Sequence, residues 1–388
     1  MNNLKKILVL GLVDSIHVAR WLEQFKDCNV EFYIYPSHKF KLINPELKKL
    51  ISTKNVARYI IISPLRAKIF YGYLDYLFFE FFSKIFPQAC RTNHLKKVLK
   101  IHKFQYVHAI EIQSAGYLIK DMSLKLLSDS KIIVTNYGSD IYYFMQYPEH
   151  EMKIRKVLEI AQYYSAECFR DYKLARDLGF TGVELPCIPN AGGFNLPSTS
   201  QEISLPSNRN QIIIKGYGGE LGRADIPVNL IELIALEFPQ INFFIYSATN
   251  DILELIERFP TKIKQRVTVA KIRDRLPNNQ IMNEFKKSRL YVGSSKSDGI
   301  STSFLQAILT GAYPIQTNTS CASEWIARGV QASIVDVDSS IIYREIRVAL
   351  TNDSLVDQAL HKNLKIAKEY LDYEVIRQQS LQFYGLIE

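Results

Sequence analysis

The chain has 388 residues, of which 47% are hydrophobic and 22% charged, and its formal net charge is +9. This length suits two domains of about 150 to 200 residues each, and the composition excludes disordered, collagenous and disulfide-scaffold proteins. Residues 51–105 contain ten lysines and arginines against two acidic residues, a net +8. Positive charge this local argues against nucleic-acid binding and favours docking to an anionic membrane surface.

The five cysteines are odd in number and widely spaced, which favours reduced thiols over disulfides or a metal site. The apolar stretch 7–13 is short for the core of a signal peptide and cannot span a bilayer. No other stretch offers about 18 apolar residues without a charge. We therefore expect a cytoplasmic protein, at most peripheral on the inner face of the cytoplasmic membrane.

The first half of the chain alternates between strand and helix patterns. Residues 7–11 form a short apolar run, typical of a strand buried on both faces of a parallel sheet. A turn and a helical pattern over 16–25 follow. Further strands are expected at 30–35, 106–110, 132–136 and 184–188.

Residues 189–210 are rich in glycine, proline and serine, which is typical of a linker. The alternation then restarts, and after 364 the pattern is helical. The expected strands are 211–215, 243–246, 267–270, 290–293 and 313–316, with helices at 229–238, 252–259 and 303–310. The sequence thus predicts an α/β protein of two successive doubly wound domains.

The most informative loop contains Asp298 and Gly299, between a predicted strand and a predicted helix. Gly299 lets the backbone approach a ligand closely, and backbone amides at the helix amino end can point at a diphosphate. These amides belong to Ile300, Ser301 and Thr302. Gln306, eight residues after Asp298, lies on about the same face. From spacing alone, an Asp cap on an ordinary amphipathic helix is the favoured interpretation.

The segment 294–325 resembles the donor-binding signature of retaining GT-B glycosyltransferases of family 4. In that signature a Glu-Gly loop leads into a helix with a second Glu eight positions later, where this chain has Asp298 and Gln306. The resemblance implies that Asp298 faces the donor sugar and that Gln306 holds the ribose hydroxyls. It also places Glu324 in the donor site.

Two loops of the first domain resemble the acceptor side of the same family. Residues 14–21 are similar to its amino-terminal loop, and 135–141 to a loop usually written His-Gly-x-Asp, in which Tyr137 takes the place of the His. The acceptor-side residues implied by this resemblance are Ser15, His17, Tyr137, Gly138, Ser139 and Asp140.

Lys215 and Arg223 resemble the basic pair that neutralises the donor diphosphate, although a solvated loop would have the same composition. A fixed cation there stabilises the charge that grows on the leaving group. With Asp298 they make the expected catalytic set, with no metal ion and no cofactor. The glycines at 216–222 lack the register of a dinucleotide-binding loop, and His108 is expected to be a core residue rather than a base.

The resemblance implies a GT-B fold, with two Rossmann-like domains facing across a cleft. Residues 1–200, joined by a terminal helix at 366–388, would bind a saccharide or lipid-linked saccharide acceptor. Residues 205–365 would bind a nucleoside-diphosphate sugar. The implied activity is retaining hexosyl transfer in bacterial surface polysaccharide or lipopolysaccharide synthesis.

Two alternatives to this function remain open. The same fold serves sugar-nucleotide 2-epimerases, which need acid–base residues and a His around the sugar. A degenerate partner subunit without turnover would explain the departures at Tyr137, Asp298 and Gln306. Separately, nine aromatic residues between 70 and 86 fit either a helix in a membrane interface or one packed between layers of the protein.

Overall fold

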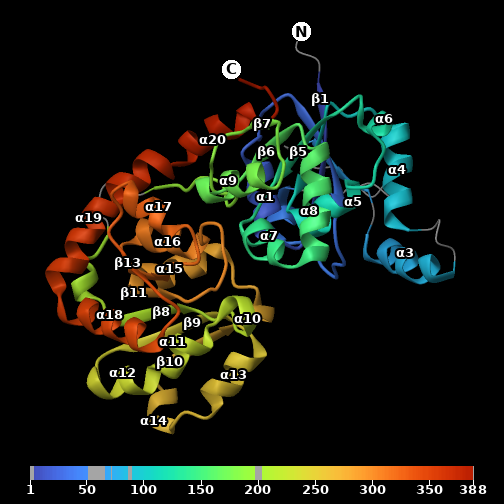
Figure 1. Cartoon of the computed structure of the whole chain (residues 1–388). Helices are drawn as coiled ribbons and strands as arrows, with labels where there is room; N and C mark the ends of the chain where they lie inside the picture. The colour runs from blue at the N-terminus through green and yellow to red at the C-terminus, as the bar shows by residue number, and fades with distance from the viewer. Residues whose placement is uncertain (1–3, 51–65, 71, 86–89, 197–202, 388) are drawn as a thin grey trace. The chain divides into compact units, whose positions relative to one another are not determined.

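The computed structural model describes residues 4–50, 66–70, 72–85, 90–196 and 203–387. The chain forms two compact units, one of residues 1–193 with 374–388 and one of residues 194–373 (Figure 1). Each unit has one parallel β-sheet flanked by helices. The doubly wound α/β architecture predicted from the sequence is therefore confirmed.

The sheet of the first unit runs in the order β3-β2-β1-β4-β5-β6-β7, with every neighbouring pair parallel. Residues 7–10 of its central strand are fully buried, because helices cover both faces. The strand order reverses between β1 and β4. The strands are β1 (Lys5–Gly11), β2 (Val30–Pro36), β3 (Arg66–Ile69), β4 (Tyr106–Ile110), β5 (Lys131–Thr135), β6 (Tyr163–Ser165) and β7 (Val183–Glu184).

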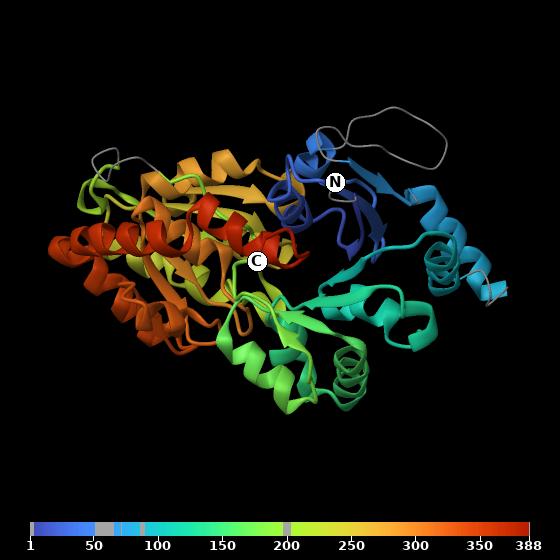
Figure 2. The same ribbon diagram turned by 90° about the horizontal axis from the view of Figure 1, so that it is seen from above.

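The helices of the first unit connect these strands and cover the sheet (Figures 1 and 2). They are α1 (Ile16–Glu23), α2 (Pro45–Leu50), α3 (Tyr73–Ile85), α4 (Arg91–Ile101), α5 (Tyr117–Ile119), α6 (Leu124–Leu127), α7 (Ser139–Tyr142), α8 (Pro148–Ile160), α9 (Phe169–Asp177) and, at the carboxyl end of the chain, α20 (Tyr373–Gln382). Among the helices of the described residues, none has both the length and the apolar character needed to cross a bilayer.

The sheet of the second unit runs in the order β10-β9-β8-β11-β12-β13, again fully parallel. Its order reverses between β8 and β11. The strands are β8 (Gln211–Lys215), β9 (Asn242–Ala248), β10 (Val267–Lys271), β11 (Ser288–Gly293), β12 (Tyr313–Thr317) and β13 (Ser333–Val335). The helices are α10 (Gly219–Gly222), α11 (Asp225–Asn229), α12 (Ile231–Glu237), α13 (Asn250–Glu257), α14 (Thr261–Lys264), α15 (Asn278–Lys287), α16 (Thr302–Thr310), α17 (Ala322–Ala327), α18 (Ser339–Thr351) and α19 (Asp353–Tyr370).

The strands that the sequence analysis missed are short. β3 has four residues, and β6 and β13 have three each. None of them contains the continuous apolar run that marks the central strands, since they pair near the edges of their sheets. The strand expected at 184–188 is also shorter and earlier, because only Val183 and Glu184 pair with β6.

The boundary between the two units near the carboxyl end falls at residue 373. The sequence analysis groups 366–373 with the first domain, but α19 continues unbroken to Tyr370 within the second unit. Phe194 then holds the chain there, donating its amide to the carbonyl of Leu371 at 2.8 Å and accepting from the amide of Tyr373 at 3.0 Å. From 374 onward the chain belongs to the first unit, where Arg377 donates to the carbonyl of Gln24 at 3.1 Å.

A buried chain of hydrogen bonds fastens the carboxyl-terminal segment to the first sheet. The Tyr384 hydroxyl lies 2.8 Å from His108 Nδ1 and accepts from Trp21 Nε1 at 2.9 Å. His108 Nε2 lies 2.6 Å from the hydroxyl of Thr135, which in turn lies 2.6 Å from that of Ser165. His108 is fully buried with both ring nitrogens partnered, so it is the satisfied core residue that the sequence analysis expects.

Burial lowers the pKa of His108 from 6.5 to about 3. Below pH 6.5, His108 therefore binds a proton in the unfolded chain that it does not bind in the folded chain. As the pH falls from 6.5 towards 3, this group should lower the free energy of unfolding by about 1.4 kcal/mol per pH unit.

We predict that His108→Gln, which can still form hydrogen bonds but cannot titrate, will reduce the acid sensitivity of the first unit. The measurement is urea unfolding between pH 6.5 and 4.5, followed by Trp21 fluorescence in a Trp325→Phe background. Equal slopes of unfolding free energy against pH in the two proteins would show that His108 does not carry this effect.

Candidate active site

Ligands of doubly wound sheets bind beyond the carboxyl ends of the strands, where the strand order reverses. In the second unit this position lies between the neighbouring strands β8 and β11. Lys215 is the last residue of β8, and Asp298 lies in the loop after β11. Lys215 Nζ and Asp298 Oδ2 are 3.7 Å apart, with each side chain about three-quarters covered. The fold thus brings two of the predicted catalytic residues together.

Lys215 is held in its charged form by its surroundings. Burial disfavours the ammonium, but the Asp298 carboxylate and the phenols of Tyr291 and Tyr217 together raise the pKa of Lys215 above its ordinary value. The ammonium also lies 5.1 Å from the centre of the Tyr217 ring, close enough for a cation–π contact. A permanent positive charge therefore sits at the carboxyl edge of the sheet, next to one carboxylate.

Arg223 lies in the loop after β8, which is tied to the loop after β11. Ser294 Oγ donates to the carbonyl of Arg223 at 2.8 Å, and the amide of Lys296 donates to the carbonyl of Leu221 at 2.8 Å. The Arg223 guanidinium itself makes two hydrogen bonds to Asp225, at 3.0 and 3.1 Å. An incoming diphosphate has to draw this guanidinium away from Asp225 or bind beside the pair.

The glycine-rich part of the same loop does not form a cradle of free amides. The amide of Gly218 donates to Thr249 Oγ1 at 2.9 Å, and that of Gly219 donates to Asp251 Oδ2 at 3.0 Å. These two donors are used by side chains that follow β9. The glycines therefore shape the turn, in agreement with the weak dinucleotide signal of the sequence.

Helix α16 begins at Thr302, and Ser301 is the residue before it. Ser301 occupies the cap position, three residues after Asp298, and its side chain makes no capping hydrogen bond. The loop before the helix is fixed instead by strand-like pairing of Asp298 with Ser320 and by the carbonyl of Gly299, which accepts from Cys321 at 2.8 Å. The dipole of a nine-residue helix thus faces the region beside Asp298.

Gln306 lies in the middle of α16 and is only 5% exposed. Its Nε2 atom donates to Oδ1 of Asn278, the first residue of α15, at 2.9 Å. The amide oxygen and the second N–H of Nε2 remain for a ribose hydroxyl. Glu324, the other predicted donor residue, lies half-buried in the first turn of α17.

In the first unit the reversal of strand order lies between β1 and β4, and polar residues gather at the carboxyl ends around it. After β1, Ser15 caps α1 by accepting from the amide of His17 at 3.2 Å. The His17 ring lies 5.3 Å from that of Tyr137, which follows β5. Asp14 and His38 form a further pair, with Oδ1 and Nε2 3.2 Å apart. The sequence analysis did not single out His38.

Asp140 is buried and joins two loops of this edge. Its Oδ2 atom accepts from the amide of Ile112, after β4, at 2.8 Å and from that of Tyr137 at 3.3 Å. Gly138, with φ of 92°, makes the turn before Ser139 starts α7. Asp140 therefore positions the loop that contains Tyr137.

Glu111 is a residue of this edge that the sequence analysis missed. It directly follows β4 at the reversal of strand order, and its φ of 83° is rare for a residue other than glycine. Its carboxylate accepts from the amide of Ser114 at 2.8 Å. Burial raises the pKa of Glu111, and burial together with the nearby Glu111 charge raises the pKa of Asp140 well above its ordinary value. Only its place after a predicted strand could have drawn attention to it.

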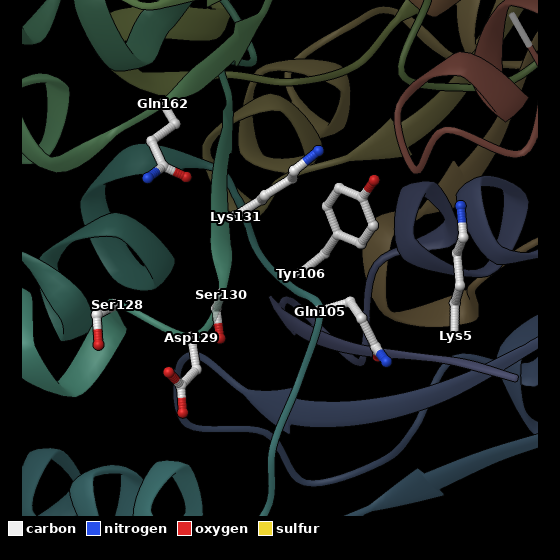
Figure 3. Close-up of a pocket in the computed structure, with 8 residues that line it drawn as sticks. All are labelled: Lys5, Gln105, Tyr106, Ser128, Asp129, Ser130, Lys131 and Gln162. Carbon is white, nitrogen blue, oxygen red and sulfur yellow. The ribbon is translucent and has the colours of Figure 1, made fainter. Parts of the chain in front are cut away.

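Each unit also has a cavity away from these edges. In the first unit, a cavity of about 440 Å³ lies at the amino ends of the strands, where Lys5, Tyr106 and Lys131 point to the same side (Figure 3). In the second, a cavity of about 420 Å³ lies between β10 and α15. The first lies at the edge of the sheet opposite to the candidate residues and contributes none of them.

Comparison with known proteins identifies the fold. No protein-family description and no curated sequence matches the chain. Among solved structures, sucrose-phosphate synthase from Thermosynechococcus elongatus is 13% identical, with a TM-score of 0.71 over 98% of both chains. HepE from Anabaena, in complex with UDP and glucose, is 15% identical, with a TM-score of 0.66 over 99% of this chain and 100% of that one.

TarM from S. aureus, as a mutant in complex with fondaparinux, alpha-GlcNAc-glycerol and UDP, is 10% identical, with a TM-score of 0.66 over 98% of this chain and 100% of that one. All three likenesses extend over both units. The chain has the GT-B fold. At these identities the comparison fixes the GT-B fold of the backbone, while the chemistry has to be argued from the residues described above.

We predict that Gln306→Ala will weaken the binding of a free nucleoside diphosphate by about 1 to 2 kcal/mol, the value of one or two hydrogen bonds. Asn278→Ala is the matched control, because it breaks the same contact between α15 and α16 but leaves the Gln306 side chain in place. Calorimetry should show the larger loss for Gln306→Ala. Equal losses of affinity in the two variants would mean that binding depends on the contact between α15 and α16 and not on the Gln306 side chain itself. Unchanged affinity in Gln306→Ala would mean that Gln306 does not bind the ribose.

Proposed function

We propose that this protein is a glycosyltransferase, which moves a sugar from a nucleoside-diphosphate sugar to a hydroxyl of a saccharide acceptor. Three similar GT-B structures contain UDP, one of them with glucose, one with saccharide ligands and one, a pneumococcal O-GlcNAc transferase, with GlcNAc. The observation that carries the proposal is the pairing of Lys215 with Asp298 at the reversal of strand order in the second unit.

This pair matches what departure of a nucleoside diphosphate needs. Negative charge grows on the diphosphate as its bond to the sugar breaks, and a fixed ammonium stabilises that charge without rearrangement. Lys215 supplies the ammonium, and Arg223 offers a second cation on a loop joined to the same site. Asp298 keeps Lys215 charged and can accept a hydrogen bond from the donor sugar.

We propose retention of configuration, with the acceptor attacking the face from which the diphosphate leaves. The leaving phosphate then takes the acceptor proton, so that neither a protein nucleophile nor a metal ion is required. The polar residues at the carboxyl edge of the first sheet, including His17, Tyr137 and Glu111, would hold the acceptor. Because that edge is built on fixed strand ends, it can orient a hydroxyl reproducibly.

We propose a lipid-linked saccharide as the acceptor, in the synthesis of a bacterial surface polysaccharide or lipopolysaccharide. A lipid-linked acceptor lies at the membrane surface, and the net +8 of residues 51–105 suits the anionic inner face of that membrane. A 2-epimerase or an inactive partner subunit would bind the same donors but would transfer no sugar to an acceptor.

The proposal is tested by measuring thermal shifts with UDP-, GDP- and ADP-sugars, followed by transfer assays with the donor that binds. At 100 times its dissociation constant, a donor should stabilise the protein by about 2.7 kcal/mol.

We predict that Asp298→Asn will fold normally and transfer at least about tenfold more slowly, equivalent to about 1.4 kcal/mol. Glu237→Gln, which breaks a surface ion pair with Arg347 in the same unit, should leave the rate unchanged. Donor turnover without an acceptor would favour an epimerase instead.

We predict that Lys215→Ala and Arg223→Ala will each weaken donor binding and slow transfer, and that a chelator will change neither. Asp225→Asn should have the opposite effect on binding, since it frees the Arg223 guanidinium for the diphosphate. Calorimetry with the nucleoside diphosphate compares the three variants. Loss of activity with chelator would contradict the metal-free mechanism.

A further inference from the structure

Helix α3 carries a continuous apolar stripe on its outer side. Leu74, Phe78, Phe81 and Ile85 follow one another at spacings of four, three and four residues, which places them on one face of a helix. Their side chains are 78%, 52%, 62% and 59% exposed, respectively. Single exposed apolar residues are common, but four in one stripe mark an interaction surface.

The opposite side of α3 is already in contact with the protein. Tyr76 and Phe79 pack against the core of the first unit. The Arg91 guanidinium lies 5.1 Å from the centre of the Tyr76 ring, and the His94 ring lies 5.0 Å from that of Phe79. A helix that is apolar on two opposite sides is normally buried, whereas α3 lies at the rim of the first unit in both views (Figures 1 and 2).

The charges around α3 indicate what covers the stripe. Lys84 on α3 and Lys97 and Lys100 on α4 are exposed. The two acidic residues of α3 are engaged locally, since Asp75 accepts from the amide of Gly72 at 3.0 Å and Glu80 pairs with Lys39 at 3.2 Å. An apolar, aromatic stripe on a unit that exposes cations on α3 and on the neighbouring α4 matches the interface of an anionic bilayer, where rings reach the acyl chains and ammonium groups meet phosphates.

We propose that α3 lies in the interface of an anionic lipid membrane, with Leu74, Phe78, Phe81 and Ile85 inserted below the headgroups. The lysines of α3 and α4 then contact the lipid phosphates. This goes beyond attraction by charge alone, because the stripe contributes an apolar interaction that salt does not screen. It also goes beyond the proposed transfer reaction, since it requires neither a donor nor an acceptor.

The test is sedimentation of the full chain with vesicles of phosphatidylcholine, alone and mixed with phosphatidylglycerol. We predict binding to the mixed vesicles that Phe78→Ser/Phe81→Ser weakens at least about tenfold, since two large apolar side chains are lost. Leu233→Ser/Leu236→Ser is the matched control, because these residues of α12 in the second unit are also exposed, at 47% and 77%. This control should bind the vesicles as the unchanged protein does.

Further measurements separate lipid insertion from the alternatives. Lys97→Glu/Lys100→Glu should weaken binding to the mixed vesicles, and the fluorescence of a Phe78→Trp variant should shift to shorter wavelength when the vesicles are added. Nucleoside diphosphate affinity, which should be unchanged in every variant, reports folding and the donor site independently. The proposal is overturned if the unchanged protein ignores the mixed vesicles or if Phe78→Ser/Phe81→Ser binds them equally well. It is also overturned if that variant instead dissociates a dimer found without lipid, since the stripe then contacts a second copy.

Discussion

Neighbouring parallel strands have to be joined by crossovers that pass over a face of the sheet, and this requirement shapes both units of the protein. It buries the central strands on both faces, which is why residues 7–10 and 290–292 are fully enclosed apolar runs. It also collects at one edge the loops that follow the strands. Where the strand order reverses, after β1 and β4 and again after β8 and β11, no crossover helix fills the space between neighbouring loops. Both sets of candidate residues lie at these points or at the end of the strand next to them.

The electrostatic character of the two edges differs. In the second unit, each predicted cation has an acidic partner, Asp298 for Lys215 and Asp225 for Arg223. Such pairing holds the cations in place without a ligand and leaves them available to a diphosphate, which offers more negative charge than one carboxylate. In the first unit two acidic side chains of the edge, Glu111 and Asp140, are buried, and burial raises their pKa values. Acidic side chains at that edge suit a hydroxyl-rich ligand better than an anion.

The carboxyl-terminal segment and helix α3 differ in how completely their side chains are packed. At the carboxyl end, Tyr384 completes a buried polar chain through His108, so that the last residues are fastened to the first sheet. Helix α3 has the opposite property, since its inner side is packed and its outer side exposes large apolar residues. Large apolar side chains left in water forgo the stabilisation that burial would give them, which is why we assign the stripe to a lipid surface.

The sequence by itself determined the two doubly wound units and the long central strands, because a strand buried on both faces needs an apolar run whatever its neighbours are. It also indicated that Asp298 precedes a helix. Tertiary structure alone decided that Lys215 meets Asp298, 83 positions further along the chain, that the amide of Gln306 is held by Asn278, and that Glu111 adopts a strained backbone beside Asp140. These contacts depend on which strand ends become neighbours, and no local sequence pattern determines the order of the strands in a sheet. The short strands β3, β6 and β13 were not predicted from the sequence for the same reason, since pairing with a neighbour, rather than their own composition, makes them strands.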